Sequence, residues 1–541
     1  MLVFRENRVS VSAHLLVQTL AERLRVVGSD RDALLDVLLR AGELECALAD
    51  AGSPTAVCLA LVTDTFAAAI VNGDALDSGR LAGILAGCDV SSEVKVSPPE
   101  GFSYYALHPM QYADLAAKVP LTSSYAVVIG IRNIGTTLSA VVVGALARRG
   151  AHAERITVRP TGHPFHRVTN FTPDQISWIE RHRESDFFIV DEGPGLSGSS
   201  FLSVGEALVR AGVQREQICF LCSHSPQPES LCSHNAAARW SSFRSYAVEN
   251  NSHIPPEPAV ELSGAAWREH VFSDRHAWPG VWTQMERVKF LSDDRKRLVK
   301  FEGFGRFGAE VLERNRAIAR AGFGTEAVEF HEGFATYPWI SGRHGRYTRL
   351  SESLLSRLAD YCAFRAREFP QCSSNASLGD MLRCNVSEEF GTEAEIDESL
   401  LEPNFPIVVD GHMHPHEWLQ SEKGVWLKVD GGSHGDDHFY PGPTDIAWDL
   451  AGTIVEWQLD RYATEYFLAR YRAQSGENPA SRLPAFLLAY AAFRMGYCKM
   501  AAGSVCDPDE RQRLIRDYRR YRAVLQERLP ETSFKLQVSG S

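Results

Sequence analysis

Hydrophobic positions follow two different periods in the first half of the chain. Between residues 12 and about 95, Ala and Leu recur at helical spacing, as in Leu34, Leu35, Leu38 and Leu39, and this predicts a helical domain over residues 1–95. From Tyr125 onward, short β-rich runs alternate with Gly-rich turns and helical stretches. Strand, turn and helix in alternation imply right-handed crossovers, so we expect a doubly wound parallel sheet over residues 96–250. The β-rich runs are 126–129, 155–158, 187–190 and 218–221.

A polar, Pro-containing stretch separates this pattern from a different one in the second half. Residues 249–258 contain three prolines and predict a linker, taken as 251–280. Residues 287–291 and 297–301 flank a polar turn and predict a hairpin. Residues 453–529 are helical in pattern, with aromatic residues on the apolar face. We therefore expect an α+β part with two lobes, 281–345 and 346–541, after the α/β part.

Composition narrows the class of protein. The chain has 541 residues, 44% hydrophobic and 23% charged, which is enough for two to four cores. Its net charge of -12 argues against a nucleic-acid partner. No leader-like N-terminus and no apolar run of about 18 residues is present, so we expect a cytoplasmic protein without a membrane span. Eleven cysteines lie scattered. Cys219, Cys222 and His224, with Cys232 and His234, are a possible zinc set, but a buried strand over 217–222 is the favoured interpretation.

A loop rich in small residues follows the β-rich run 187–190. At the carboxyl end of a strand in an open α/β sheet, such a loop lies where ligands bind. Its backbone amides, its hydroxyls and the dipole of the next helix can hold one phosphate, while Asp191 and Glu192 suit the hydroxyls of a ribose. The alternative is an ordinary strand-to-helix turn with nothing bound. The phosphate candidates are Gly193, Gly195, Ser197, Gly198, Ser199 and Ser200.

This loop resembles the phosphoribosyl-pyrophosphate loop of type I phosphoribosyltransferases. It is one residue longer than usual, and Glu192 stands where the family has a second aspartate. Residues 125–138 resemble the family's pyrophosphate loop, and 154–167, with Arg159, His163, His166 and Arg167, stand in the place of its mobile loop. The resemblance implies phosphoribosyl pyrophosphate and Mg²⁺ as ligands, with donors to the leaving group from Arg132, Asn133, Gly135, Thr136 and Thr137.

In the second half, Lys300 lies on the second strand of the predicted hairpin, and Glu310 and Glu313 lie on the helix that follows. A strand lysine that pairs with a helix glutamate holds nucleotide phosphates in protein-kinase-like folds. Residues 334–342, including Trp339, resemble the hinge strand between the lobes. These features resemble the aminoglycoside-phosphotransferase group and imply ATP binding through Lys300, Glu310 and Trp339.

The segment 409–419 carries this resemblance furthest. The family's catalytic loop reads H-G-D-x-H-P-x-N, and here Gly411, His414 and Pro415 agree with it. The family's His and Asp are exchanged as Asp410 and His412, and either is chemically capable of accepting the acceptor's proton. Glu417 replaces the metal-binding Asn, and Asp430 falls on the metal-binding Asp. Residues 443–451 match the downstream helix start. The cluster of Asp430, His434, Asp436, Asp437 and His438 favours a metal site over a solvated acidic loop.

Together the two resemblances imply a bifunctional transferase. One half would transfer a phosphoribosyl group from phosphoribosyl pyrophosphate, the other would transfer phosphate from ATP, and both would require Mg²⁺ and small-molecule acceptors. Two alternatives remain open: a single-activity kinase whose first half senses a phosphorylated ribose, and a regulatory protein in which neither half turns over. Phosphoribosyltransferase folds often pair, so a homodimer is a weak expectation.

Overall fold

The chain folds into two compact units of mixed α and β structure. The computed structural model describes residues 1–28, 30–88, 90, 92–249, 259–374, 377–392, 397–435 and 437–529. One unit comprises Arg8–Pro256 with Phe304–Arg306, and the other comprises Met1–Asn7, Glu257–Gly303 and Phe307–Ser541. The helical segment expected as a domain of its own therefore groups with the sheet that follows it. Residues 251–258, the first part of the expected linker, lie outside the described residues.

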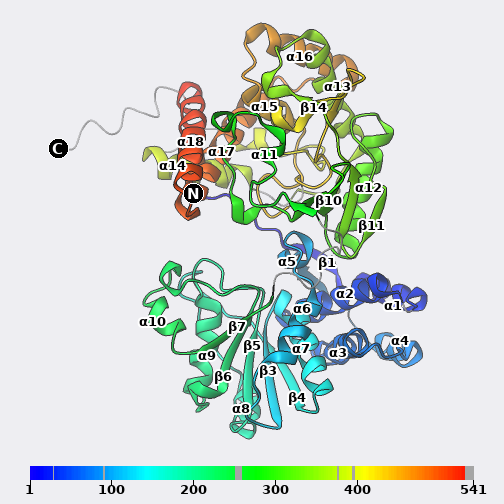
Figure 1. The fold of residues 1–541 in the computed structure, drawn as a ribbon, viewed down its shortest axis with the longest axis vertical. Helices are drawn as coiled ribbons and strands as arrows, with labels where there is room; N and C mark the ends of the chain where they lie inside the picture. The colour runs from blue at the N-terminus through cyan, green and yellow to red at the C-terminus, as the bar shows by residue number, and fades with distance from the viewer. Residues whose placement is uncertain are drawn as a thin grey trace, which may run out of the picture. The chain divides into compact units, whose positions relative to one another are not determined.

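A five-stranded parallel sheet forms the centre of the first unit, in the order β4-β3-β5-β6-β7 (Figure 1). Each of the four β-rich runs lies within one of its strands. Neighbouring strands are parallel throughout, so their carboxyl ends meet at one edge. The strands are β3 (Tyr125–Ile131), β4 (His152–Val158), β5 (Asp186–Val190), β6 (Ile218–Cys222) and β7 (Arg244–Ala247).

Helices cover both faces of this sheet because its strands alternate apolar side chains to either side. Helices α8 (Pro173–Arg181), α9 (Ser199–Arg210) and α10 (Ala236–Trp240) share a core with one face, to which Val127, Phe187 and Phe220 contribute. Helix α7 (Ile134–Arg148) packs on the other side, with α6 (Pro109–Lys118), α2 (Arg31–Asp50) and α3 (Ala56–Asn72) against it. The smaller elements of the unit are β1 (Val9–Ser12), α1 (Ala13–Val26), α4 (Ser78–Ala86), β2 (Glu93–Val96) and α5 (Glu100–Ser103).

A buried ion-pair network ties α2 and α3 to the sheet. Arg155 on β4 forms two 2.8 Å hydrogen bonds with the carboxylate of Glu45 on α2. Its Nε also donates to Asp64 on α3 over 2.5 Å. Because Arg155 and Glu45 are each only 4% exposed, this contact fixes the two helices beside the sheet edge at β4.

The second unit begins with an antiparallel sheet in the order β11-β12-β10-β9-β8. The predicted hairpin is present as β9 (Lys289–Ser292) and β10 (Arg297–Phe301), paired antiparallel. Helix α12 (Arg306–Arg320) follows, and its Leu312 packs against Ala335 and Tyr337 of the sheet. The remaining strands are β8 (Ala259–Glu261), β11 (Glu329–His331) and β12 (Phe334–Pro338).

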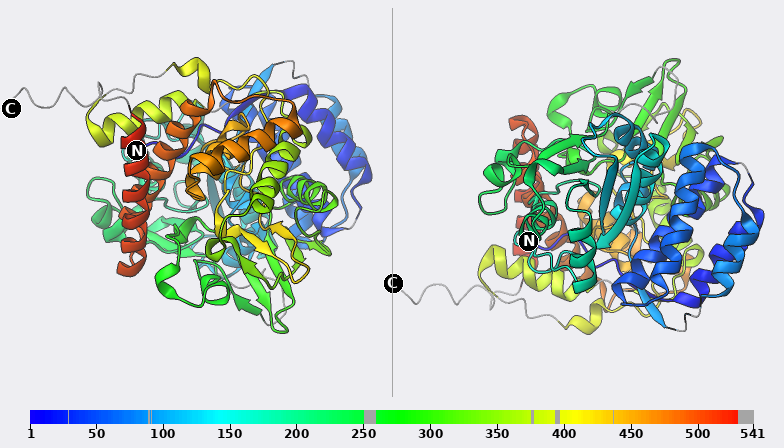
Figure 2. Two further views of the ribbon diagram at one scale, coloured as in Figure 1. Left: turned by 90° about the horizontal axis from the view of Figure 1, so that it is seen from above. Right: turned by 90° about the horizontal axis from the view of Figure 1, so that it is seen from below.

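A mainly helical part completes this unit around one large core. Helices α17 and α18 pack side by side (Figures 1 and 2), and α17 is buried on nearly all sides. The first residues of the chain also belong here, because Phe4 pairs with Phe439 and stacks on its ring. The elements are β13 (Arg343–His344), α13 (Glu352–Glu368), α14 (Leu378–Phe390), β14 (Trp418–Gln420), β15 (Trp426–Lys428), α15 (Ala447–Glu456), α16 (Arg461–Ser475), α17 (Leu483–Ser504) and α18 (Pro508–Arg528).

Within the described residues, every helix is too short or too polar to cross a membrane.

Candidate functional site

The loop that begins at Val409 is held in place by a buried carboxylate in the first turn of α15. Asp449 accepts hydrogen bonds from the backbone N–H groups of Asp410 and Gly411, over 2.8 and 2.9 Å. Burial, with the neighbouring charge of Asp410, raises the pKa of Asp449 to about 6, although these hydrogen bonds favour its ionised form. Gly411 has a φ of +75°, a conformation that glycine adopts without strain. These two hydrogen bonds and the conformation of Gly411 together define the backbone of the loop.

Within this loop, Asp410 is enclosed and His412 is accessible. The Tyr361 hydroxyl donates to Asp410 Oδ2 over 2.5 Å, and Lys428 Nζ lies 3.2 Å from Oδ1. Arg365 lies 3.7 Å from the same carboxylate. Asp410 is 1% exposed, whereas the His412 side chain is 33% exposed. Of the two residues expected to accept a proton, only His412 is exposed to solvent.

Lys428 is a buried cation that no motif in the sequence indicates. Its Nζ donates to Glu417 Oε2 and to the carbonyl of Val429, each over 2.8 Å. Burial alone would lower the pKa of Lys428, but the carboxylates of Asp410 and Glu417 raise it above its usual value. Burial opposes ionisation of Glu417 as well, and the Lys428 charge nevertheless holds its pKa well below the usual range. One oxygen of Glu417 is therefore occupied by an ammonium group.

Lys300 joins the antiparallel sheet to the loop that follows β15. Its Nζ forms an ion pair with Asp430, donates to Ser433 Oγ over 2.8 Å and lies 3.4 Å from Glu302 Oε2. Despite the effect of burial, the Lys300 charge lowers the pKa of Asp430 far below its usual value. The sequence predicts Glu310 as the partner of Lys300. The structure places Glu310 on the exposed side of α12, and Glu302 supplies the buried carboxylate instead.

Trp339, expected in the nucleotide site, lies just after β12 and is half-buried. Its backbone N–H donates to the carbonyl of Lys296 over 2.7 Å, which extends the pairing of β12 with the hairpin. This contact places Trp339 at the end of the sheet, where the chain continues toward the helical part.

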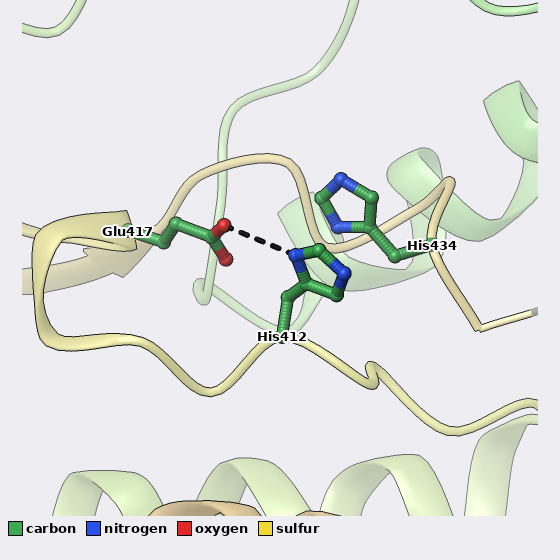
Figure 3. Close-up of side chains that lie close together, drawn as sticks. All are labelled: His412, Glu417 and His434. Carbon is green, nitrogen blue, oxygen red and sulfur yellow. Dashed lines mark ion pairs between the residues drawn. The ribbon is translucent and has the colours of Figure 1, made fainter. Parts of the chain in front are cut away.

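Two imidazoles and one carboxylate come together, as Figure 3 shows, and Lys428 donates to the carboxylate. His412, Glu417 and His434 each offer a ligand atom, and these atoms lie within 4.8 Å of one another. The rings of His412 and His434 stack with centroids 3.9 Å apart. His434 Nε2 lies 3.5 Å from Asp430 Oδ2, which connects this group to the Lys300 ion pair.

The rest of the acidic and histidine cluster predicted after β15 has other surroundings. The Asp437 carboxylate accepts from the backbone of Phe439 over 2.8 Å, and the carbonyl of Asp437 accepts from Arg5. His438 stacks on Phe4 with ring centroids 5.3 Å apart. Both residues therefore help to anchor the start of the chain. Asp436 lies outside the described residues.

In the first unit, the loops after β3 and β5 lie against each other at the carboxyl edge of the sheet. A Cβ atom added to Gly135 would stand 2.5 Å from the carbonyl oxygen of Val190, so only glycine permits this approach. Asn133 takes a φ of +116° in the same turn. Thr136 and Thr137 are buried in α7, and Thr137 faces Gly42 of α2. The structure thus turns these two predicted pyrophosphate ligands toward the protein interior.

The acid pair after β5 is held by neighbouring groups. The Tyr112 hydroxyl donates to the carbonyls of Asp191 and Glu192, over 2.6 and 2.9 Å. The backbone N–H of Gly101 donates to Glu192 Oε2 over 3.1 Å. Burial raises the pKa of Asp191 to about 7, and burial together with the charges of Glu100 and Asp191 raises that of Glu192 to about 8. The two carboxyls are therefore partly protonated near neutral pH.

Two hydroxyls of the predicted phosphate loop already bind a carbonyl of the chain. Ser197 Oγ and Ser199 Oγ donate to the carbonyl of Pro164, over 2.9 and 2.5 Å. Pro164 belongs to the segment expected as a mobile loop. Gly195 and Gly198 have φ values of +55° and +67°, and α9 begins at Ser199. Gly193 lies beside His224, and Ser200 is half-buried in the first turn of α9.

The basic groups expected near a pyrophosphate meet an acid of the helical segment instead. Arg132 lies 3.2 Å and Arg159 2.5 Å from the carboxylate of Asp50 at the end of α2. Arg159 also donates to the carbonyl of Arg132 over 2.7 Å. A ligand phosphate at this place would have to compete with Asp50 for both guanidinium groups.

The two cysteines of the possible zinc set that lie on β6, Cys219 and Cys222, have the properties of buried thiols. Cys219 and Cys222 are both buried, and burial raises the pKa of each to about 12, so neither is a thiolate at neutral pH. The favoured interpretation of this segment as a buried strand is confirmed.

Comparisons with known proteins found no family model and no curated protein that matches this chain. Among solved structures, the chain is similar to the choline kinase LicA from Streptococcus pneumoniae, with 14% identity over 44% of this chain and 89% of that one, at a TM-score of 0.30. Macrolide 2'-phosphotransferase MphH from Brachybacterium faecium gives 15% identity, 43% and 88% coverage and a TM-score of 0.29. A Plasmodium vivax ethanolamine kinase gives 10% identity, 45% and 81% coverage and a TM-score of 0.32. A likeness at this level assigns the chain neither a family nor an activity.

Proposed function

We propose that the unit built from Met1–Asn7, Glu257–Gly303 and Phe307–Ser541 transfers the γ-phosphoryl group of ATP to a small molecule. The observation that supports this most directly is the ion pair between Lys300 of β10 and Asp430 after β15. A buried ammonium and a half-buried carboxylate from separate parts of one unit are groups of the kind that bind the phosphates and the metal ion of a nucleotide. Without a nucleotide, each serves as the partner of the other.

The chemistry follows from what each group contributes. Lys300 would bind phosphate oxygens and Asp430 would supply one ligand to Mg²⁺, which when bound offsets the charge of the phosphates. The bond from the γ-phosphorus to the bridging oxygen would break with ADP as the leaving group, a bond to the acceptor oxygen would form, and the proton of the acceptor hydroxyl would pass to His412 or to water. His412 supplies the exposed polar group next to the acceptor, because Asp410 is enclosed.

Glu417 does not fit the role of second Mg²⁺ ligand that was predicted from the sequence. Its Oε2 is bound by Lys428, and its Oε1 lies 3.5 Å from His412 Nδ1. Mg²⁺ prefers several oxygen ligands and retained water molecules. An ammonium and two imidazoles around a single carboxylate offer a different set, so we assign Mg²⁺ to Asp430 alone.

The test measures ATP binding and turnover in the whole chain. We expect ATP with Mg²⁺ to raise the melting temperature, Asp430→Ala and Lys300→Met to abolish the rise, and ADP to form in the presence of amino alcohols or aminoglycosides as trial acceptors. Glu310→Gln, on the exposed side of α12, is the matched control and should keep the rise. Absence of both a shift and ADP formation would reject the proposal.

We further propose that the first unit binds phosphoribosyl pyrophosphate. The specific support is the pair of hydroxyls, Ser197 and Ser199, that converge on one acceptor oxygen at the carboxyl end of β5. A phosphate oxygen could replace the Pro164 carbonyl in these two hydrogen bonds. Asp191 and Glu192 stand at the start of the same loop, where the hydroxyls of a ribose would meet them.

This second proposal is tested separately from the first. Phosphoribosyl pyrophosphate should raise the melting temperature of the wild type, and Glu192→Ala or a double Ser197→Ala/Ser199→Ala variant should remove that rise while the ATP response persists. Release of pyrophosphate on addition of nucleobases would indicate a transferase, and binding without release would indicate a sensor. If ribose 5-phosphate and phosphoribosyl pyrophosphate both leave the melting temperature unchanged, the proposal fails.

A further inference from the structure

Three side chains in and beside the loop 409–417 have the residue types and the spacing of a transition-metal site. His412 belongs to the loop fixed by Asp449, Glu417 ends the short helical turn Pro415–Glu417, and His434 lies in the turn after β15. Their ligand atoms lie within 4.8 Å of one another, and the His412 Nδ1 to Glu417 Oε1 distance is 3.5 Å. Ligands of one tetrahedral Zn²⁺ lie about 3.3 Å apart, given bond lengths of about 2.0 to 2.1 Å. The present spacing requires small side-chain rotations only.

The surroundings of His434 direct one of its nitrogens toward a ligand role. Its Nε2 lies 3.5 Å from Asp430 Oδ2, so the carboxylate favours a proton on Nε2. Its Nδ1 is buried and has no hydrogen-bond partner among the residues that the structure describes. A carboxylate behind a histidine is the usual second layer of a protein metal site. A nitrogen lone pair without a partner is thus present beside Glu417 and His412.

Glu417 is oriented in a similar way. Lys428 donates to its Oε2 over 2.8 Å and leaves Oε1 on the side of His412. Lys428 Nζ also lies 3.2 Å from Asp410 Oδ1, so its positive charge is divided between two carboxylates and compensates that of Glu417 only in part. The carboxylate therefore presents one oxygen to the two imidazoles, as Figure 3 shows.

We propose that His412, Glu417 and His434 bind a divalent metal ion of the Zn²⁺ class. Imidazole ligands suit Zn²⁺, whereas Mg²⁺ and Mn²⁺ prefer oxygen. Three protein ligands leave at least one coordination position open, and the His412 side chain is 33% exposed, so solvent reaches this group of ligands. A hydroxyl bound there would lose its proton more readily, and this would give His412 a part in the reaction as a ligand.

The three proposed ligands include neither Lys300 nor Asp430, although Asp430 orients His434, so metal binding can be measured separately from the proposed phosphotransfer. The experiment uses the whole chain after treatment with a chelator, and nucleotide is omitted. We expect Zn²⁺ titrated by calorimetry to bind once per chain at micromolar or lower Kd. Co²⁺ should give visible absorption without a thiolate charge-transfer band, which excludes cysteine sites such as Cys232.

The variants make the assignment specific. His412→Ala and His434→Ala should each weaken Zn²⁺ binding at least about tenfold, and Glu417→Gln should weaken it less because one oxygen remains. His163→Ala/His166→Ala, a pair of neighbouring histidines with ring centroids 5.9 Å apart in the other unit, is the matched control and should bind as the wild type does. Circular dichroism verifies that each variant is folded.

Several outcomes would overturn the proposal. The first is that calorimetry detects no stoichiometric binding of Zn²⁺, and the second is that His434→Ala and His434→Gln leave the Zn²⁺ affinity unchanged. The third is a Co²⁺ spectrum with a thiolate charge-transfer band. The fourth is that Mg²⁺ at an equal concentration displaces Zn²⁺. The first would show that the stacked histidines and the Glu417 ion pair are structural. A failed phosphotransfer assay would not change the interpretation of these metal-binding measurements. Loss of Zn²⁺ binding would likewise not change the interpretation of the melting-temperature shifts caused by ATP.

Discussion

Replacing Lys428 by methionine tests whether the loop at 409–417 depends on one buried charge. Methionine keeps most of the apolar stem and removes the ammonium that donates to Glu417 over 2.8 Å and lies 3.2 Å from Asp410. Lys428 has 0% side-chain exposure, so water does not replace the lost contact. Removing one partner of a buried ion pair costs about 3–5 kcal/mol, and we expect a loss in this range. Asp410 retains Tyr361 and Arg365, so most of the loss comes from Glu417.

Urea unfolding measured by tryptophan fluorescence reports on the affected unit. All of the ten tryptophans except Trp178 and Trp240 lie in it. A loss of this size should lower the urea midpoint by on the order of 1 M, given that large units have steep urea dependence. Lys423→Met is the matched control, because Lys423 is exposed on the hairpin between β14 and β15 and should change the free energy of unfolding by less than about 0.5 kcal/mol. Equal midpoints for Lys428→Met and Lys423→Met would refute the reasoning.

Three further outcomes follow from buried charges elsewhere. Arg155→Leu should destabilise the first unit by about 3–5 kcal/mol in urea unfolding, because it leaves Glu45 buried without a partner, and a double Arg155→Leu/Glu45→Leu variant should recover most of the loss. Burial raises the pKa of Glu192 from 4.5 to about 8, so the folded state holds a proton that the unfolded state releases. The free energy of unfolding should therefore fall as the pH rises from about 5 to 8, and Glu192→Gln should flatten this fall in melting temperatures taken across that range. Asp449→Asn should cost about 2 kcal/mol and lower the rate of phosphotransfer, since an amide cannot accept equally well from two N–H groups; unchanged stability would mean that the loop holds its shape without Asp449.

The sequence was sufficient to predict elements whose position follows from chain order. The β-rich runs lie in the parallel sheet, and the loops after β3 and β5 meet at its carboxyl edge because right-handed crossovers place them there. The hairpin with Lys300 is predicted for a similar reason, since its two strands are neighbours in sequence.

Contacts set by register and by distant segments were not predictable in this way. Lys428 reaches Glu417 because Trp418 pairs with Lys428 across β14 and β15, and two three-residue strands carry no alternation from which to infer this register. Residues 1–7 join the second unit through the contact of Phe4 with Phe439, and these two residues are separated by most of the chain. The choice of Glu302 over Glu310 as partner of Lys300 depends on which side of α12 faces the sheet. Sequence spacing within α12 does not contain that information.

The order of aspartate and histidine in the loop 409–417, exchanged relative to the family that the sequence resembles, can be related to burial. Position 410, histidine in the resembled family, lies inside the protein, and position 412 lies at its surface. A carboxylate at the inner position requires compensating donors, and Lys428, Arg365 and Tyr361 supply them. Once Lys428 is present, it also binds Glu417 and makes that carboxylate a poor ligand for Mg²⁺. The imidazole at the outer position then faces Glu417 and His434. The buried aspartate, the lysine beside it and the proposed nitrogen-rich metal site are therefore physically linked, and a loss of Zn²⁺ binding in His412→Ala would test the last of them.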